Sequence, residues 1–137
     1  MLVFRWDREY GPELSRPYTS GHHKVPLGYS SVGVRAFKGC SAIEKVTLPW
    51  GLREIGWEAF KSCYALKEIN FPRGLKQIGS KAFADCRSLR VISFPKNAGH
   101  IEIKDDAFIG CTALSEASKE HILGCNPKCT FENELKL

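Results

Sequence analysis

The sequence predicts an α/β repeat solenoid, a fold in which short units of equal length stack on one another. The first observation is a 23-residue period: the segment Ile55–Leu75 starts again at Ile78 and has an earlier copy from Val32. The second is that each copy pairs a short apolar stretch with a glycine-containing turn. One such unit cannot bury its apolar face alone, so its neighbours must supply the core. The third is size, because 137 residues with 43% hydrophobic residues suit one folded domain.

Each copy is expected to hold one strand, best seen in the residues that end at Pro72. Alternate side chains of a strand point to opposite faces. Ile69 and Phe71 are therefore expected to point inward, while Glu68 and Asn70 point outward. Proline lacks a backbone donor, so Pro72 is expected to end the strand.

The rest of each copy is expected to form short turns on the other side of the coil. The segment Glu58–Cys63 is predicted to make about one helical turn, which would place Phe60 and Cys63 on one face. Three glycines are expected in turns that need a positive φ: Gly28, Gly51 and Gly74. One phenylalanine per copy is expected to form the main core column: Phe37, Phe60, Phe83, Phe108 and Phe131.

The repeats divide the chain into three parts. Residues 1–24 are expected to form an N-terminal cap and a degenerate first strand, with a disordered leader as the alternative for residues 1–17. Residues 25–118 hold a half repeat and copies that start at 32, 55, 78 and 103. Two extra residues fall between Pro95 and Ile103, where a turn tolerates them. Residues 119–137 are a degenerate partial fifth repeat or a C-terminal cap.

The end of the array raises a separate question about strand edges. The last complete strand is expected near Leu114–Ser118, and an exposed edge strand invites pairing with another chain. Either residues 119–137 fold over that edge, or the edge is used for self-association or for a continuation of the array. Leu123, Phe131 and Leu135 could cover the edge, which favours the cap.

The repeated pattern I-G-x-x-A-F-x-x-C-x-x-L-x-x-I-x-(apolar)-P-x-x-L resembles the BspA-like leucine-rich repeat family across roughly residues 25–137. The resemblance implies a right-handed superhelix with a concave parallel β-sheet and short helical turns or loops on the convex side. It also implies a role in protein-protein interaction, often at a cell surface.

The six cysteines fall into two groups. One repeat position carries Cys40, Cys63, Cys86 and Cys111. Stacked equivalent side chains point the same way, whereas a disulfide needs facing Cβ vectors, so these residues are predicted to be buried thiols. Cys125 and Cys129 lie outside this register. With His121 they make a poor zinc set, which leaves a local disulfide or two ordinary cysteines as alternatives.

No catalytic, cofactor or metal site is expected. His22 and His23 have no partner at a recognisable spacing and are expected in an exposed loop. There is no phosphate-binding glycine loop, no Ser/His/Asp set and no paired carboxylates within a motif. The net charge of +5 is not gathered in one block, so attraction to nucleic acid or to a membrane surface is expected to be weak.

The compartment depends on whether the chain is complete. No apolar run approaches membrane-spanning length, and Met1–Phe4 is too short for the core of a signal peptide. The expectation is an intracellular protein if the chain is whole, and a cell-surface one if it belongs to a longer protein.

A protein partner is expected to bind the outward positions of the concave sheet. The candidate residues are Lys45, Thr47, Lys67, Glu68, Asn70, Arg90, Val91, Ser93 and Glu116. Equivalent positions of adjacent copies should pair Glu44 with Lys67 and Lys45 with Glu68, whereas Arg90 follows Lys67 with the same charge.

Two alternatives accompany this prediction. Trp50 and Trp57 stand at positions that vary between copies, and two exposed tryptophans close together would form an interaction hot spot in the loops. The chain could also be a structural fragment of a longer cell-surface adhesin or receptor array.

Overall fold

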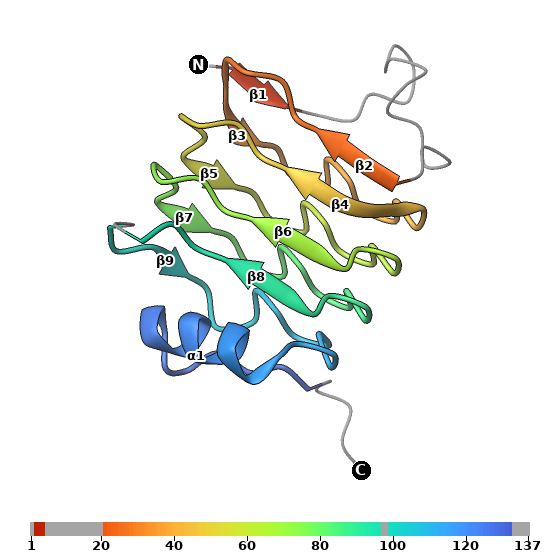
Figure 1. Ribbon diagram of the computed structural model, residues 1–137, viewed down its shortest axis with the longest axis vertical. Helices are drawn as coiled ribbons and strands as arrows, with labels where there is room; N and C mark the ends of the chain where they lie inside the picture. Colours follow the sequence, from red (N-terminus) through yellow and green to blue (C-terminus); the bar gives the residue numbers. More distant parts are fainter. Residues whose placement is uncertain (1, 5–20, 97–98, 133–137) are drawn as a thin grey trace.

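The strands of the chain alternate between two parallel sheets as the backbone coils upon itself (Figure 1). The computed structural model describes residues 2–4, 21–96 and 99–132. Within these ranges the first sheet has four strands in the order β2-β4-β6-β8. The second has five strands in the order β1-β3-β5-β7-β9.

The four-stranded sheet contains the strands that the repeat predicts. Its members are β2 (Gly21–Lys24), β4 (Ile43–Thr47), β6 (Glu68–Asn70) and β8 (Val91–Ser93). Val46 pairs with Ile69, and Ile69 pairs with Ile92, so the strands follow one another at the repeat spacing. The parallel stack confirms the solenoid and its register.

The five-stranded sheet was not anticipated from the sequence. Its members are β1 (Leu2–Phe4), β3 (Tyr29–Val32), β5 (Glu54–Ile55), β7 (Gln77–Ile78) and β9 (Glu102–Ile103). Ile55 pairs with Ile78, and Ile78 pairs with Ile103, so the two extra residues after Pro95 do fall between strands. Most of the N-terminal cap expected for residues 1–24 lies outside the described residues; of that segment, only β1 and β2 are described.

The turns after the second sheet are not helical, which corrects the prediction for Glu58–Cys63. Glu58 and Ser62 have positive φ values of 53° and 62°, so the backbone alternates between right- and left-handed conformations. The hydrogen bonds alternate as well: Ala59 N donates to Gly56 O within the turn, and Phe60 N donates to Ala82 O of the next repeat. The turns are thus bonded to one another along the stack.

A column of phenylalanine rings fills the core, as predicted. Successive ring centroids of Phe37, Phe60, Phe83 and Phe108 lie 4.9, 5.0 and 5.1 Å apart, with planes within 6° of parallel. All four side chains are buried. Phe131, the fifth expected member, is half-buried and packs against the core from the side of the C-terminal segment.

The four cysteines in register are buried beside this column. The thiols of Cys63, Cys86 and Cys111 donate to the carbonyl oxygens of Phe37, Phe60 and Phe83, at 3.1, 3.1 and 2.9 Å. Each thiol therefore satisfies a backbone carbonyl of the preceding repeat. Burial raises the pKa of Cys40 to about 12, and electrostatic coupling to Cys63 acts in the same direction.

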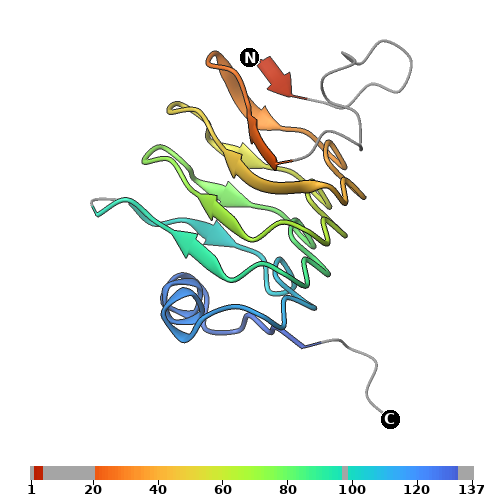
Figure 2. The same ribbon diagram turned by 45° about the vertical axis from the view of Figure 1, so that its right-hand side comes forward.

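The strand expected near Leu114–Ser118 is not formed, because a helix, α1 (Glu116–Cys125), occupies this place. Ser115 caps the helix, and its side chain accepts from Ser118 N. The helix lies across the end of both sheets (Figure 2). The repeat pattern decays here, and Ser115 offers a helix start where the equivalent residues Lys67 and Arg90 stand directly before a strand.

Polar side chains of the C-terminal segment form hydrogen bonds with backbone groups at the last strand of each sheet. The buried Ser118 hydroxyl accepts from Ile92 N at 3.0 Å and donates to Arg90 O at 3.3 Å, as the backbone of a further strand would. The side chain of Asn126 donates to Ile103 O at 2.6 Å. Leu123 packs against the core, while Leu135, the other residue expected there, lies outside the described residues.

Candidate protein-interaction surface

The outward side chains of the four-stranded sheet form a single broad face, here called the sheet face. Eight of the nine predicted binding residues lie on it or at its strand ends: Lys45, Thr47, Lys67, Glu68, Asn70, Arg90, Val91 and Ser93. Strand alternation turns these side chains away from the core. Arg90, Val91 and Ser93 are exposed, and Val91 retains 47% of its accessible surface.

Two ion pairs cross adjacent strands on the sheet face, as predicted. Lys67 Nζ lies 3.1 Å from Glu44 Oε1, and Lys45 Nζ lies 3.6 Å from Glu68 Oε2. All four side chains are well exposed, so each pair contributes little to stability, about 0.2–1 kcal/mol. The pairs neutralise the face over β4 and β6.

The β8 end of the sheet face differs from β4 and β6 because its cation, Arg90, has no counter-charge among the described residues. Arg90 N donates to Lys67 O at 2.9 Å, so the two cationic residues are neighbours along the stack. Among the described residues, no acidic side chain forms an ion pair with Arg90. Val91 stands opposite Glu68, which already pairs with Lys45. A positive charge and an apolar side chain are therefore left beside each other.

A row of short polar side chains runs beside these charges. Thr47 pairs in register with Asn70, and Asn70 pairs with Ser93. Ser93 Oγ donates to Asn70 Oδ1, and His22 contacts the Thr47 hydroxyl. Because these side chains are short and polar, the middle of the face is polar and projects little from the sheet.

Glu116, the ninth predicted residue, is not on the sheet. It lies in the first turn of α1, where its carboxylate is 3.7 Å from Lys119 Nζ. The prediction assumed a further strand at this position, and the start of the helix moves the side chain away from the β8 row.

The two tryptophans lie in different turns. Trp50 precedes β5 and Trp57 follows it, so the strand separates the turns that hold them. Trp50 retains 80% of its accessible surface beside a hollow of about 260 Å³. Trp57 is covered on one side by the Arg35 guanidinium, whose carbon lies 4.3 Å from the ring centroid.

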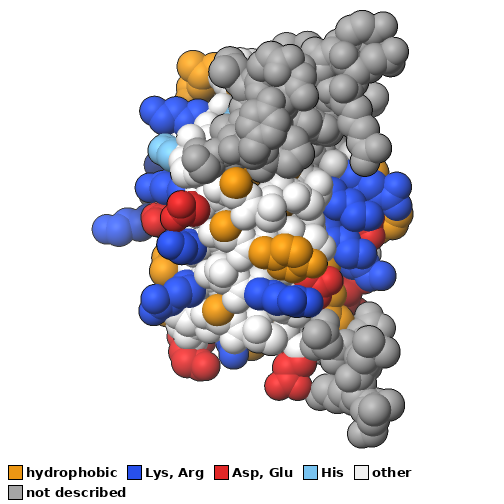
Figure 3. All heavy atoms as spheres, turned by 90° about the vertical axis from the view of Figure 1, so that its right-hand side faces the viewer, with side chains coloured by type: hydrophobic (Ala, Val, Ile, Leu, Met, Phe, Trp, Pro, Cys, Tyr) orange, Lys and Arg blue, Asp and Glu red, His pale blue; other side chains and the backbone are white. Residues whose placement is uncertain are grey.

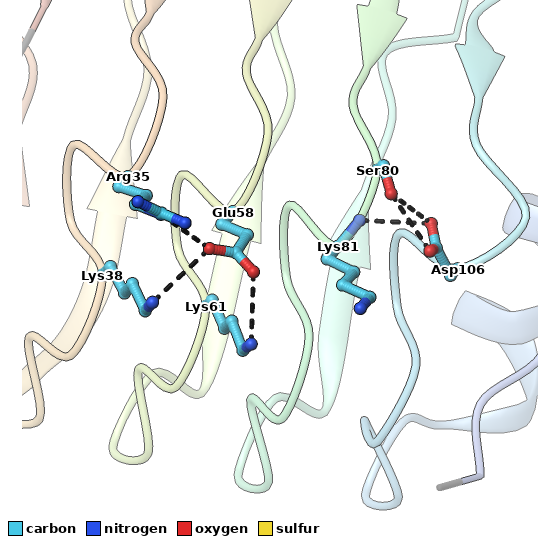
Figure 4. A network of polar contacts seen from close by, with 7 residues as sticks. All are labelled: Arg35, Lys38, Glu58, Lys61, Ser80, Lys81 and Asp106. Carbon is cyan, nitrogen blue, oxygen red and sulfur yellow. Dashed lines mark hydrogen bonds and ion pairs between the residues drawn. The ribbon is translucent and has the colours of Figure 1, made fainter. Parts of the chain in front are cut away.

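A buried carboxylate in the turns was missed by the sequence analysis. Glu58 accepts from Arg35 Nε at 2.8 Å and from Lys61 Nζ at 3.2 Å, and Lys38 Nζ lies 3.4 Å away (Figure 4). Burial acts to raise the pKa of Glu58, but the hydrogen bonds from Arg35 and Lys61 and the charges of Lys61 and Lys38 outweigh it. The pKa is lowered to about 2.

A second carboxylate forms a separate set of polar contacts further along the stack. Asp106 accepts from the Ser80 hydroxyl at 2.9 Å and from Lys81 N at 3.2 Å (Figure 4). One repeat position thus holds Arg35, Glu58, Lys81 and Asp106 in succession, with alternating charges. The signal was available in the sequence, since these residues share the 23-residue register apart from the two-residue insertion.

The turns form a face of their own between the two sheets. Lys and Arg side chains gather along both margins of this side, and mostly uncharged surface lies between them (Figure 3). One margin belongs to the sheet face and the other to the turns that hold the Glu58 network.

A family comparison identifies the repeat. The model for the BspA type leucine-rich repeat region, built from six copies, matches residues 21–137. The chain belongs to the BspA-type leucine-rich repeat family. Proteins of this family are repeat proteins, typically linked to protein interaction or to surfaces, and are generally non-enzymatic.

Solved structures of leucine-rich repeat and related proteins are also similar to this chain. A leucine rich cell surface protein of Faecalibacterium prausnitzii is 26% identical with a TM-score of 0.46, over 72% of this chain and 34% of that one. The pneumococcal vaccine antigen PcpA is 17% identical with a TM-score of 0.47, over 85% and 42%. The BspA-type chain therefore spans only about a third of the Faecalibacterium protein's length. A comparison with curated proteins gave no match.

The remaining sequence candidates carry no site in the described part of this BspA-type solenoid. His22 and His23 lie in β2 rather than in a loop, and the His23 ring packs edge-on against Phe37 with centroids 5.2 Å apart. Among the described residues, no group of three or more His, Cys, Asp or Glu is placed to hold a metal ion. No helix in these ranges is long and apolar enough to cross a bilayer.

Proposed function

We propose that this leucine-rich repeat domain is a scaffold that binds another protein on its sheet face, and that the partner presents acidic groups to the β8 end. The observation that supports the proposal most directly is the exposed pair Arg90 and Val91. The charges on Glu44, Lys45, Lys67 and Glu68 over β4 and β6 are paired, whereas Arg90 at the β8 end has no ion pair among the described residues.

The shape of the face suits a protein partner. Its strands present rows of side chains at the strand spacing of about 4.8 Å, so an opposing surface can contact several repeats at once. Short side chains in the Thr47–Asn70–Ser93 row leave room for a partner's backbone or side chains. An exposed valine beside an unpaired arginine combines apolar contact with charge recognition, a mixture common at interfaces.

The proposed partner should therefore depend on Arg90. The test is to capture the binding protein with the immobilised domain, identify it by mass spectrometry, and measure its affinity for Arg90→Glu by surface plasmon resonance. We expect affinity to fall by on the order of ten-fold or more, mainly through a faster off-rate, because a like charge replaces an attractive contact. The melting temperature should change little, since the exposed arginine has no ion pair in the described structure.

Lys128→Glu is the matched control. It makes the same charge change on an exposed residue after α1, away from the sheet face. Unchanged binding in both variants would contradict the proposal and favour the alternative, a structural piece of a longer surface array that uses no free sheet face. Equal losses in both would indicate attraction to net charge alone.

A further inference from the structure

The turns that follow the strands of the four-stranded sheet form a second surface, here called the turn edge. These turns project beyond the strand ends at the left of Figure 1. Leu27 and Trp50 occupy the same position in successive repeats and retain 68% and 80% of their accessible surface. Both line the hollow of about 260 Å³, with Gly28 and Gly51 in its wall. Exposed apolar side chains around a hollow mark an interaction site more strongly than scattered ones.

The apolar end of the turn edge continues into uncompensated positive charge. Arg73 and Lys96 follow Leu27 and Trp50 at the same repeat position. Arg53 and Lys76 form a parallel row, in which Lys76 N donates to Arg53 O at 2.8 Å. All four cationic side chains are exposed. None of the four has an ion pair among the described residues.

Uncompensated neighbours of like charge cost stability, by amounts comparable to what opposite pairs contribute. On the sheet face and in the Glu58 network, adjacent repeats compensate most cations with Glu side chains. At the turn edge, no such compensation is present in the described structure. An anionic partner would supply it.

We infer that the turn edge docks an acidic segment of another protein, with an apolar side chain of that segment seated between Leu27 and Trp50. The hollow would hold the apolar anchor, and Arg53, Arg73 and Lys76 would contact carboxylates that follow the anchor toward the next repeats. A buried aromatic or aliphatic anchor ringed by charge contacts is the usual composition of a protein hot spot.

The local chemistry favours a protein segment over a nucleic acid. Long polyanions gain affinity by neutralising many phosphates, and four cations are few for that purpose. Glu54 is exposed beside Arg53 and would repel a continuous phosphate backbone, whereas a short acidic segment can avoid it. Leu27 has no π face on which a base could stack.

The test uses the whole domain and a short synthetic peptide rich in Asp and Glu with one central leucine. NMR titration of the ¹⁵N-labelled domain should shift the Trp50 indole signal and the Leu27 amide, with a dissociation constant on the order of a millimolar. The double variant Arg53→Glu/Arg73→Glu should bind on the order of ten-fold more weakly. Lys104→Glu/Lys128→Glu, which makes the same charge change elsewhere, should bind as the parent does.

Four further comparisons make the result decisive. Trp50→Ala should weaken binding of the peptide, whereas Trp57→Ala should leave the affinity unchanged. Melting curves should show that both variants fold. Equal binding of a peptide with Asn and Gln in place of the acids would overturn the charge requirement. Equal or tighter binding of a single-stranded oligonucleotide of the same charge would overturn the choice of a protein segment. Shifts confined to Arg90 and Val91 would place the peptide on the sheet face and refute the turn edge.

This inference does not depend on the function proposed for the sheet face. Arg90→Glu is expected to leave the peptide titration unchanged, so either proposal can fail while the other stands.

Discussion

Two glycines, Gly56 and Gly79, fix how closely the repeats approach at the start of the turns. A Cβ added at Gly79 would lie 3.0 Å from the carbonyl carbon of Gly56 and 3.1 Å from Ile55 O. These neighbours are backbone atoms held in the stack, so they cannot yield as a flexible side chain would. The sequence predicts a turn here, and the structure shows instead that the limit is contact between backbones.

Gly79→Ala should therefore destabilise the domain by about 1–3 kcal/mol, the range for forcing extra atoms into packed structure. Urea unfolding followed by circular dichroism measures it. Gly74→Ala is the matched control, because its Cβ would meet only Leu52 O at 3.8 Å. Gly74 was expected to need a positive φ and does not, unlike Gly28 and Gly51. Similar curves for the two variants would contradict the close approach.

Glu58 should make stability depend on acid pH. Its pKa is lowered to about 2 from an ordinary value of 4.5. The native state therefore favours the carboxylate, and this stabilisation is complete above about pH 4.5 and is lost as the pH falls toward 2. Its partners are partly exposed, which screens the charges, so the contribution is about 1–3 kcal/mol.

Unfolding of Glu58→Gln at several pH values tests this dependence. The variant should be less stable than the parent at pH 6, and the difference should shrink as the pH approaches 2. Glu102→Gln is the control, because that exposed residue has one lysine partner at 3.4 Å. A constant difference at every pH would show that the carboxylate charge is not what stabilises the turn.

At the scale of elements, α1 replaces the strand that the repeat pattern would place after β8. Ser118 provides the two hydrogen bonds at Ile92 N and Arg90 O, and Ser115 N provides another to Arg90 O at 2.9 Å. We propose that residues 116–132 act as a cap on the β8 edge, because these bonds occupy the groups that another strand would use.

Ser118→Ala should then leave Ile92 N without its partner in a buried site. The expected cost is about 1–3 kcal/mol, that of an unsatisfied buried donor. Hydrogen exchange followed by NMR should show faster exchange at the Ile92 amide, while the exposed Ser41→Ala control leaves it protected. Unchanged protection of Ile92 in Ser118→Ala would mean that the hydroxyl does not cap the strand.

The sequence predicts the elements that repeat, and the prediction fails where the repeat pattern changes. Inward residues such as Ile69 and the phenylalanine column recur in register, so strand position, core and cross-strand charge pairs follow directly. The three-residue spacing of Phe60 and Cys63 predicts a helical turn at Glu58–Cys63, and the structure shows a non-helical turn there. Gly39 and Gly110 occupy the position equivalent to Ser62, and these glycines indicate a left-handed backbone there.

At the scale of the whole molecule, charge is distributed along the axis of the solenoid. Residues 21–96 hold thirteen Lys or Arg and five Asp or Glu, a net charge of +8. Residues 99–132 hold three and six, a net charge of −3. The net charge of the whole chain is only +5, because the acidic end offsets part of the positive charge of residues 21–96. The total therefore does not reveal the uneven distribution. The folded body is a cationic solenoid with an acidic end, which favours acidic partners on its sides.

The candidate surfaces could be predicted only in part. Eight sheet-face residues follow from strand alternation, but Glu116 does not, because its position depends on a helix that replaces a strand. The separation of Trp50 from Trp57 depends on β5, a two-residue strand too short to be recognised from its pattern. The turn edge depends on which cations have no counter-charge, and this requires the three-dimensional arrangement.

The sheet face as the partner surface is tested most directly by photo-crosslinking from two valines. A photoreactive amino acid replaces Val91, which is 47% exposed on β8, or Val34, which is 59% exposed in a turn after the second sheet. With the captured partner present, the probe at position 91 should form the crosslink and the probe at position 34 should not. A crosslink from position 34 alone would contradict the account and place the partner on the turns.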